Sequence, residues 1–350
     1  MRVALDVTPL TTGSTGVARY VRELWRELGA AGVGTAPFAI GRGRLPAPVG
    51  VRHYRVPLRV AHATWARAGI PRAEWLVRGP VDLVHCLDMV PSPTRRPLVM
   101  TACDVAAVDR PDLHSPRQTE IQLGQLDGFR RADLVLAISE ATATALRQHG
   151  VPAERLLVTP LGVSPVARSV GPPPIGGPYL LAVGELAARK DLPTLIRAFH
   201  AARLPAGMKL VLVGPPGYRS EETTALVGGT VVATGKVDEP TLAALYAGAN
   251  GLCFPSLSEG FGLPLLEAMA RGVPVAASDI DVLRETAGSA AIYAAAGDVG
   301  AWARTLERLV DDETLRSGLA SEGRARAANA TWSRTAAATI NGYERLVACG

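Results

Sequence analysis

Cysteines are few in this 350-residue chain, and their spacing excludes the usual roles of paired cysteines. The four of them, Cys86, Cys103, Cys253 and Cys349, form no C-x-x-C pair, so neither a zinc site nor a disulfide framework is expected. No apolar run approaches the roughly 18 residues of a membrane-spanning helix. The opening MRVALDVTPL lacks the apolar stretch of a signal peptide. These features predict a cytoplasmic protein.

The composition is that of a globular protein, with 48% hydrophobic and 20% charged residues. Its length suggests two domains of roughly 150 residues each. Residues 1–165 carry 20 Lys+Arg and 14 Asp+Glu, a net charge of +6, whereas the whole chain has a net charge of +5. A basic first half would suit an acidic membrane surface, a phosphorylated acceptor or nucleic acid. Because 34 of the 37 basic residues are arginine, a compositional bias explains the charge equally well.

Short apolar strands alternate with amphipathic helices, which is typical of a parallel sheet covered by helices on both faces. In the first half, strands are expected at 2–7, 81–87, 97–103, 132–139 and 155–161, and helices at about 17–29, 116–130 and 140–148. The run SVGPPPIGGP at 169–178 is rich in proline and glycine and is predicted to be a linker.

The alternation restarts after this linker. Strands are expected in YLLAVG, KLVLVG, TVVATG, GLCFPS and PVAAS, and helices from about residue 192, at 239–248 and after Pro264. A helix at 331–347 is long enough to cross back onto the first domain. The prediction is an α/β protein with Rossmann-like domains at 1–168 and 179–330, the linker 169–178, and a C-terminal helix within 331–350 that packs on the first domain. Such domains bind ligands at the carboxyl ends of their strands.

The stretch FPSLSEGFGLPLLEAMARGVPVAAS, at 254–278, places Glu259 and Glu267 on either side of a loop that follows an expected strand. Pro264 fits the first position of a helix, which would place Glu267 in its first turn. The N–H groups at such a helix start bind anions, including a diphosphate. The two carboxylates would accept hydrogen bonds from diols, so the stretch indicates a site for a nucleotide diphosphate sugar. An alternative is that Glu267 only complements the helix dipole.

The same stretch, EGFGLPLLE followed by AMARGVPVAAS, resembles the signature of family 4 (group 1) retaining glycosyltransferases of the GT-B fold. The resemblance covers essentially the whole chain through STGVARYVREL, AISEATATALRQHGVPAERLLVTPLGV, VGELAARKDLPTLIRAF and GKVDEPTLAALYAGANGLCFPSLSEGFG. It implies two Rossmann-like domains that face each other across a deep cleft. It also implies a metal-independent, retaining hexosyltransferase of the bacterial mannosyl- or glucosyltransferase kind, with a nucleotide diphosphate sugar as donor and no cofactor.

The resemblance assigns roles to individual residues. Arg189 and Lys190 correspond to the basic pair on the diphosphate, Glu267 to the ribose-binding glutamate, and Glu259 to the glutamate near the transferred sugar. Asp104 would orient sugar or acceptor, which makes Asp104, Glu259, Arg189 and Lys190 the expected catalytic set. The remaining donor contacts would be made by the backbone of Phe261, Gly262 and Leu263, by Gly16 at the donor phosphate, and by Val237 at the base.

Cys103 departs from the family pattern, because it stands where a histidine usually contacts the donor. A thiol is only a weak hydrogen-bond donor. The alternative function is therefore a non-catalytic or partner-dependent subunit that binds sugar nucleotides. His85 lies on an expected strand and could face the cleft together with Cys103. Asp279-Ile280-Asp281 looks like a metal motif but is interpreted as helix capping, so no metal is expected.

The acceptor stays open among a glycan, a lipid and a small molecule, and the donor stays open between GDP-mannose and a UDP-hexose. Residues 51–79 are rich in arginine and contain two tryptophans, so they could form a peripheral contact with the inner face of the membrane. A loop of the acceptor site is an equally valid interpretation of this segment. The sequence contains no recognised nucleic-acid-binding module, and no nucleic-acid partner is expected.

Overall fold

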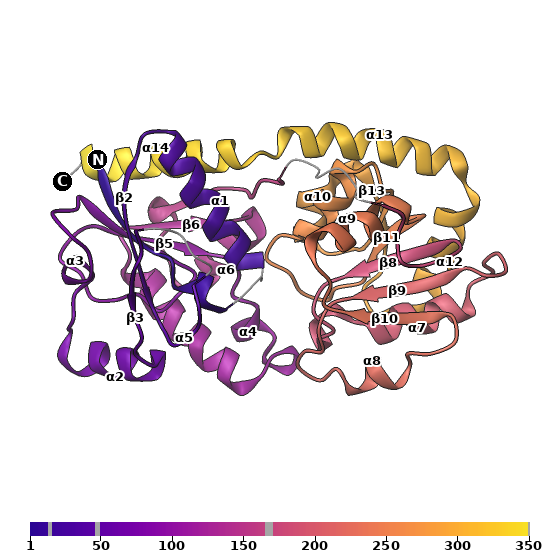
Figure 1. Ribbon diagram of the computed structural model, residues 1–350, viewed down its shortest axis with the longest axis horizontal. Coiled ribbons are helices and arrows are strands. Elements are labelled where there is room, and N and C mark those ends of the chain that lie inside the picture. The colour runs from indigo at the N-terminus through magenta and orange to yellow at the C-terminus, as the bar shows by residue number, and fades with distance from the viewer. Residues whose placement is uncertain (13–15, 46–49, 165–170, 349–350) are drawn as a thin grey trace. The chain divides into compact units, whose positions relative to one another are not determined.

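The computed structural model describes residues 1–12, 16–45, 50–164 and 171–348, and these separate into two compact α/β units (Figure 1). The first unit comprises Met1–Val108, Arg117–Gly162 and Trp332–Gly350, and the second comprises Asp109–Pro116 and Val163–Thr331. Each unit is thus assembled from separate stretches of the chain. The linker expected at 169–178 begins with two residues that lie outside the described part.

The described part of the first unit contains a seven-stranded parallel sheet with the order β3-β2-β1-β4-β5-β6-β7. Its strands are β1 (Arg2–Asp6), β2 (Gly34–Ile40), β3 (Arg52–Tyr54), β4 (Leu83–Leu87), β5 (Leu98–Ala102), β6 (Leu134–Ala137) and β7 (Leu156–Val158). The order reverses between β1 and β4, which are hydrogen-bonded neighbours. Ligands of doubly wound sheets bind beyond the carboxyl ends of strands at such a reversal.

The helices of the first unit are α1 (Gly16–Ala30), α2 (Leu58–Ala68), α3 (Ala73–Leu76), α4 (Ala106–Asp109), α5 (Pro116–Arg131), α6 (Glu140–Gln148) and α14 (Trp332–Ala348). The C-terminal helix α14 packs against α1 and β6. A Cβ atom on Gly342 would lie 2.9 Å from the side chain of Leu134, so the glycine lets α14 approach the sheet closely without displacing that leucine. The Tyr20 and Trp332 rings also face each other, with centroids 6.2 Å apart.

The second unit has a six-stranded parallel sheet in its described part, with the order β10-β9-β8-β11-β12-β13. Its strands are β8 (Tyr179–Val183), β9 (Lys209–Val213), β10 (Val231–Gly235), β11 (Gly251–Phe254), β12 (Val275–Ser278) and β13 (Ala291–Ala294). Its helices are α7 (Leu192–Ala201), α8 (Glu221–Ala225), α9 (Glu239–Gly248), α10 (Leu263–Ala270), α11 (Asp281–Ala287), α12 (Val299–Asp311) and α13 (Glu313–Asn329). Leu195, Trp302 and Leu306 are fully buried in the core that these helices form with the sheet.

Strands β8 and β11 are neighbours at the reversal of strand order in the second sheet. The loops after these two strands therefore start side by side, although about 70 residues separate them in the sequence. The loop after β8 carries Arg189 and Lys190, and the loop after β11 carries Glu259. This topology brings the expected diphosphate-binding and sugar-binding residues together.

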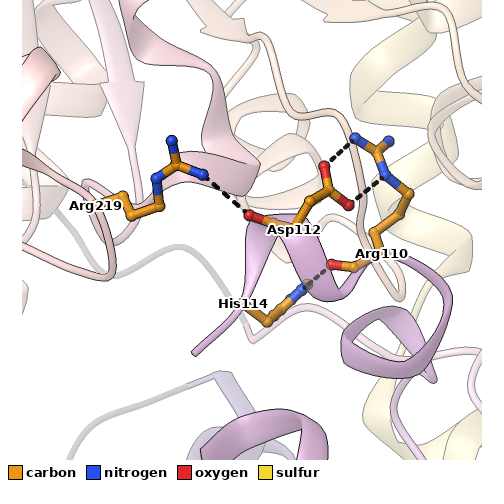
Figure 2. A network of polar contacts seen from close by, with 4 residues as sticks. All are labelled: Arg110, Asp112, His114 and Arg219. Atoms are coloured by element: carbon orange, nitrogen blue, oxygen red, sulfur yellow. Dashed lines mark hydrogen bonds and ion pairs between the residues drawn. The ribbon is translucent and has the colours of Figure 1, made fainter. Parts of the chain in front are cut away.

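The segment Asp109–Pro116 joins the second unit, although it lies between two stretches of the first. Within it, Arg110 donates to both carboxylate oxygens of Asp112, at 3.0 and 2.8 Å, and its carbonyl oxygen lies 3.0 Å from Nδ1 of His114 (Figure 2). Nη1 of Arg219, from the second unit, donates to the carbonyl oxygen of Asp112 at 3.3 Å. The predicted domain 1–168 includes these residues, so the place of Asp109–Pro116 in the second unit was not predicted from the sequence.

Two details of the predicted elements are wrong. Helix α10 begins at Leu263, so Pro264 is its second residue and Glu267 its fifth, beyond the first turn. The Asp279 side chain does not cap α11; it forms a bidentate ion pair with Arg284. The cause of the second error is that an arginine five residues away supplies two charged donors, which a carboxylate prefers to backbone N–H groups.

Candidate active site

The centre of the site in the second unit is an ion-pair cluster of Glu259 with Lys190 and Arg189. Oε1 of Glu259 lies 2.5 Å from Nζ of Lys190 and 2.9 Å from Nη1 of Arg189. The Glu259 and Lys190 side chains are only 10% and 8% exposed, and that of Arg189 is 26% exposed. One carboxylate oxygen therefore bridges the two cations that were expected to bind a diphosphate.

Close packing at the ends of β8 and β11 fixes the position of Lys190. Its Nζ lies 4.3 Å from the centroid of the Phe254 ring, at the end of β11. A Cβ atom on Gly184, just after β8, would lie 3.2 Å from Cε of the lysine, so a glycine leaves room for its stem. The N–H of Leu257 donates to the carbonyl oxygen of Arg189 at 2.8 Å and ties the two loops together. The lysine is held by both strands and not only by its own loop.

Burial and charge act in opposite directions on the members of this cluster. Burial lowers the pKa of Lys190 to about 8, against the opposing attraction of Glu259. Burial alone would raise the pKa of Glu259, but the charges of Lys190 and Arg189 outweigh it and hold this pKa below its ordinary value. Near pH 7 the cluster is thus one carboxylate with two cations, which leaves positive charge to receive an anion.

Helix α10 starts directly beyond this cluster. Gly262 precedes it with φ 95°, a left-handed conformation that favours glycine, and an added Cβ would lie 2.9 Å from Leu283. Thr286 donates a hydrogen bond of 2.5 Å to the carbonyl oxygen of Phe261. The loop backbone is therefore fixed on both sides, with the N–H groups of the first turn, including that of Leu263, at the helix start.

Glu267 is 8% exposed, and its Oε2 accepts a hydrogen bond of 3.0 Å from the hydroxyl of Tyr246 on α9. The guanidinium of Arg271 lies over the Tyr246 ring, 5.0 Å from its centroid, and donates to the carbonyl oxygen of Glu267. These contacts orient the carboxylate. Val237 is half-buried between β10 and α9. Its role at the base stays a prediction.

Asp104 and Cys103, in the first unit, follow the end of β5. Oδ1 of Asp104 accepts hydrogen bonds from the Ala106 N–H, at 3.0 Å, and from Nε2 of Gln122, at 2.9 Å. The Cys103 N–H donates to Oδ1 of Asp88 at 3.2 Å. Burial, together with the neighbouring carboxyl groups of Asp88 and Asp104, raises the pKa of the Cys103 thiol well above its ordinary value, so the thiol stays protonated.

Asp88 is a residue that sequence reasoning missed. It follows β4 directly and adopts φ 54°, which is uncommon outside glycine and is often found at functional sites. Burial and the charge of Asp104 raise its pKa to about 8. The available signal was its position, because it is the first residue beyond the carboxyl end of the strand VDLVHCL.

His85 does not face a ligand site in this structure. It is fully buried; Nδ1 lies 2.6 Å from the hydroxyl of Tyr343 on α14, and Nε2 lies 2.8 Å from Oγ1 of Thr101. Tyr20 on α1 shares the same threonine oxygen at 3.0 Å. Burial lowers the pKa of His85 to about 3, so the ring is neutral. The expectation of a cleft position is wrong, because the C-terminal helix covers this part of the sheet.

Gly16 is the first residue of α1 and is exposed. Its proposed contact with a donor phosphate stays a prediction. Within the described residues, no group of three or more His, Cys, Asp or Glu side chains is arranged to hold a metal ion. In the same part of the chain, no helix combines the length and the apolar character that crossing a membrane requires.

Two family models match the chain. Residues 14–166 match the model described as Glycosyltransferase Family 4, and residues 177–312 match the model described as Glycosyl transferases group 1. Together they cover most of both units and the site residues described above. The chain belongs to the family 4 (group 1) glycosyltransferases and is a glycosyltransferase.

Similar proteins agree with this assignment. The chain is 27% identical to O-antigen chain mannosyltransferase B of Escherichia coli, over 99% of this chain and 100% of that protein. A sucrose-phosphate synthase from Thermosynechococcus elongatus has a TM-score of 0.76 at 22% identity, with 100% of both chains covered. HepE of Anabaena, solved in complex with UDP and glucose, has a TM-score of 0.72 at 18% identity, over 99% of this chain and 100% of that one. These two structures show that the fold is GT-B.

Proposed function

We propose that the protein transfers a hexose from a nucleotide diphosphate sugar to a hydroxyl group of a glycan, lipid or small-molecule acceptor, with retention of the anomeric configuration. The observation that carries this proposal is the buried cluster of Arg189, Lys190 and Glu259 beside the start of α10. Two cations and the N–H groups of a helix start suit a diphosphate, and the nearby carboxylates suit the hydroxyl groups of ribose and sugar.

The chemistry needs no protein nucleophile. As the bond from the sugar to the diphosphate breaks, negative charge develops on the phosphate oxygens, and Arg189, Lys190 and the helix start stabilise it. The acceptor hydroxyl attacks from the same face, and the departing phosphate oxygen takes its proton. Glu259 holds the sugar, while Asp104 orients sugar or acceptor. Because the cations already compensate the leaving group, the proposed reaction needs no metal ion.

The donor is proposed to be GDP-mannose or a UDP-hexose. Similarity to an O-antigen mannosyltransferase supports mannose, and likeness to a fold neighbour solved with UDP and glucose supports a UDP-hexose. Thermal shift with GDP, UDP, ADP and their hexose conjugates, in EDTA, tests this choice. Stabilisation by one nucleotide family is expected, with its loss in Glu267→Ala and Lys190→Ala. If none stabilises the protein, the proposal fails.

Turnover and product configuration test the remaining parts. An α-linked donor is expected to give an α-linked product by NMR, with undiminished rate in EDTA; a β-linked product would contradict retention. Turnover by the purified chain alone is expected despite Cys103. Nucleotide binding without turnover, restored by an added protein, would instead support a partner-dependent subunit.

We also propose that residues 51–79 make a peripheral contact with the anionic inner face of the membrane. Four large apolar side chains of this segment are exposed, namely Val56, Val60, Ile70 and Trp75. The same segment carries arginines on β3 and α2. The segment has one acidic residue, Glu74, whose Oε1 accepts hydrogen bonds from the N–H groups of Arg95 and Arg96. Exposed apolar and basic groups without exposed acids suit an anionic lipid surface.

Flotation with vesicles containing phosphatidylglycerol tests this contact. Binding at low salt that high salt removes is expected, with loss of binding in Arg59→Glu/Arg67→Glu on α2. Arg26→Glu/Arg131→Glu is the matched control, because it makes the same charge change at exposed positions of α1 and α5. Absence of binding at low salt would exclude the membrane contact.

A further inference from the structure

The carboxylate of Glu259 already occupies the cations that the proposed function assigns to the diphosphate. Its Oε1 contacts both Nζ of Lys190 and Nη1 of Arg189, at 2.5 and 2.9 Å. An incoming diphosphate brings further negative charge to the same two groups. It must therefore compete with a carboxylate that is part of the chain.

This competition takes place where charges are poorly screened. The Glu259 and Lys190 side chains are about nine-tenths buried, so solvent weakens their attraction much less than it weakens that of a surface pair. By contrast, Arg197 and Glu222 in the same unit form an ion pair whose side chains are 49% and 60% exposed. Release of Glu259 from its cations is costly unless another partner replaces them.

We infer that Glu259 is an internal competitor that makes the site discriminate an intact nucleotide diphosphate sugar from the free nucleoside diphosphate. This inference rests on the proposed function and extends it to specificity. The sugar of an intact donor presents hydroxyl groups, which donate hydrogen bonds to a carboxylate that leaves the cations. A free nucleoside diphosphate lacks these sugar hydroxyl groups, and the additional negative charge of its terminal phosphate repels the carboxylate.

The same contact favours release of the product. After transfer, the sugar hydroxyls leave with the acceptor, and Glu259 regains Lys190 and Arg189 as its best partners. The nucleoside diphosphate that remains is then displaced by a group with a very high local concentration, because it belongs to the same chain. Glu259 is thus a specificity-determining residue for donor over product, in addition to its contact with the sugar.

Calorimetric titration of wild type and Glu259→Gln with GDP and GDP-mannose, and with UDP and UDP-glucose, tests this inference at pH 7. For the nucleotide family that binds, wild type is expected to bind the sugar conjugate more tightly than the free diphosphate. Glu259→Gln is expected to bind the free diphosphate on the order of tenfold more tightly than wild type, because a charged hydrogen-bond partner no longer competes. Its preference for the conjugate is expected to shrink or reverse.

Glu222→Gln is the matched control, since it removes the same charge from an exposed ion pair of the same unit. Wild-type affinities are expected for it. If Glu259→Gln does not fold, as judged by circular dichroism, Glu259→Asp serves instead, because it withdraws the carboxylate by one methylene and should tighten the free diphosphate to a smaller extent.

Two results would overturn the inference while leaving the proposed function intact. One is a wild type that binds the free diphosphate as tightly as the conjugate. The other is a Glu259 variant that gains no affinity for the free diphosphate, or gains equally for both ligands. A wild type that binds no nucleotide at all would refute the proposed function itself, and the inference with it.

Discussion

With Lys190 in its proposed place on the diphosphate, its pKa predicts that donor affinity depends on pH in a range where few side chains titrate. Burial places this pKa at about 8 in the ligand-free protein, below the ordinary 10.5. Only the charged ammonium compensates a diphosphate, so the proposed contact requires Lys190 to be protonated. As the pH rises through 8, the free protein loses this proton, and affinity is expected to fall.

The size of the effect follows from proton linkage. With a pKa of about 8, the protonated fraction is roughly nine-tenths at pH 7 and one-tenth at pH 9, so the dissociation constant should rise about tenfold over this range. Charged groups that act on Lys190 are Glu259, Arg189 and Glu185. Glu259 has a pKa below its ordinary value and stays ionised throughout, and an arginine stays charged as well.

Calorimetry with the sugar conjugate at pH 7, 8 and 9 measures this dependence. The sugar conjugate is the more suitable ligand for this measurement than the free diphosphate, because its phosphates carry no terminal proton that titrates near neutral pH. In buffers of different ionisation enthalpy, binding above pH 8 is expected to take up a proton. Lys190→Ala should bind more weakly at pH 7 and lose the pH dependence. Equal wild-type affinity at pH 7 and 9, or an unchanged slope in Lys190→Ala, would refute the reasoning.

Three further predictions concern single contacts. Tyr246→Phe removes the 3.0 Å hydrogen bond to Glu267 and should weaken nucleotide binding by roughly two- to tenfold in calorimetry, whereas unchanged affinity would mean that the hydroxyl does not orient the carboxylate. Tyr343→Phe leaves the buried Nδ1 of His85 without this partner and should lower the free energy of unfolding by about 1–3 kcal/mol in urea titration; equal midpoints would contradict this. Gly214→Ala places a Cβ 1.9 Å from a backbone oxygen of the adjacent loop, at φ 150°, and should lower the melting temperature by several degrees or prevent folding, so a wild-type melting curve would contradict the packing argument.

Elements with a strong local pattern could be predicted from the sequence, and elements without one could not. The helix expected at 140–148 matches α6 residue for residue, because Ser139 caps it and accepts a hydrogen bond from the N–H of Thr142. Strand β2 was missed, since GTAPFAI starts with glycine and contains Pro37, which normally argues against a strand inside a sheet. In the structure Pro37 nevertheless lies within β2, in register with Leu5 of the neighbouring strand β1.

The site residues show the same difference between what a local sequence pattern predicts and what it does not. The motif predicts roles for Glu259, Lys190 and Arg189 one by one, but their ion-pair cluster depends on the adjacency of β8 and β11, which no local pattern encodes. His85 was misplaced for a related reason. Its strand is otherwise apolar, and no residue near it in the sequence indicates that the hydroxyl of Tyr343 will form a hydrogen bond with Nδ1 of His85.

The contact between His85 and Tyr343 also sets an order of events during synthesis. At about 5–20 residues per second, the 258 positions between them separate the emergence of the two partners by roughly 10–50 s. All stretches of the second unit leave the ribosome before Trp332, at the start of α14. The second unit can therefore finish folding first, and the unit that contains the N-terminus is completed last. Until α14 arrives, the apolar surface around Leu134 on the first sheet stays uncovered, so nascent chains are most prone to aggregate in that interval.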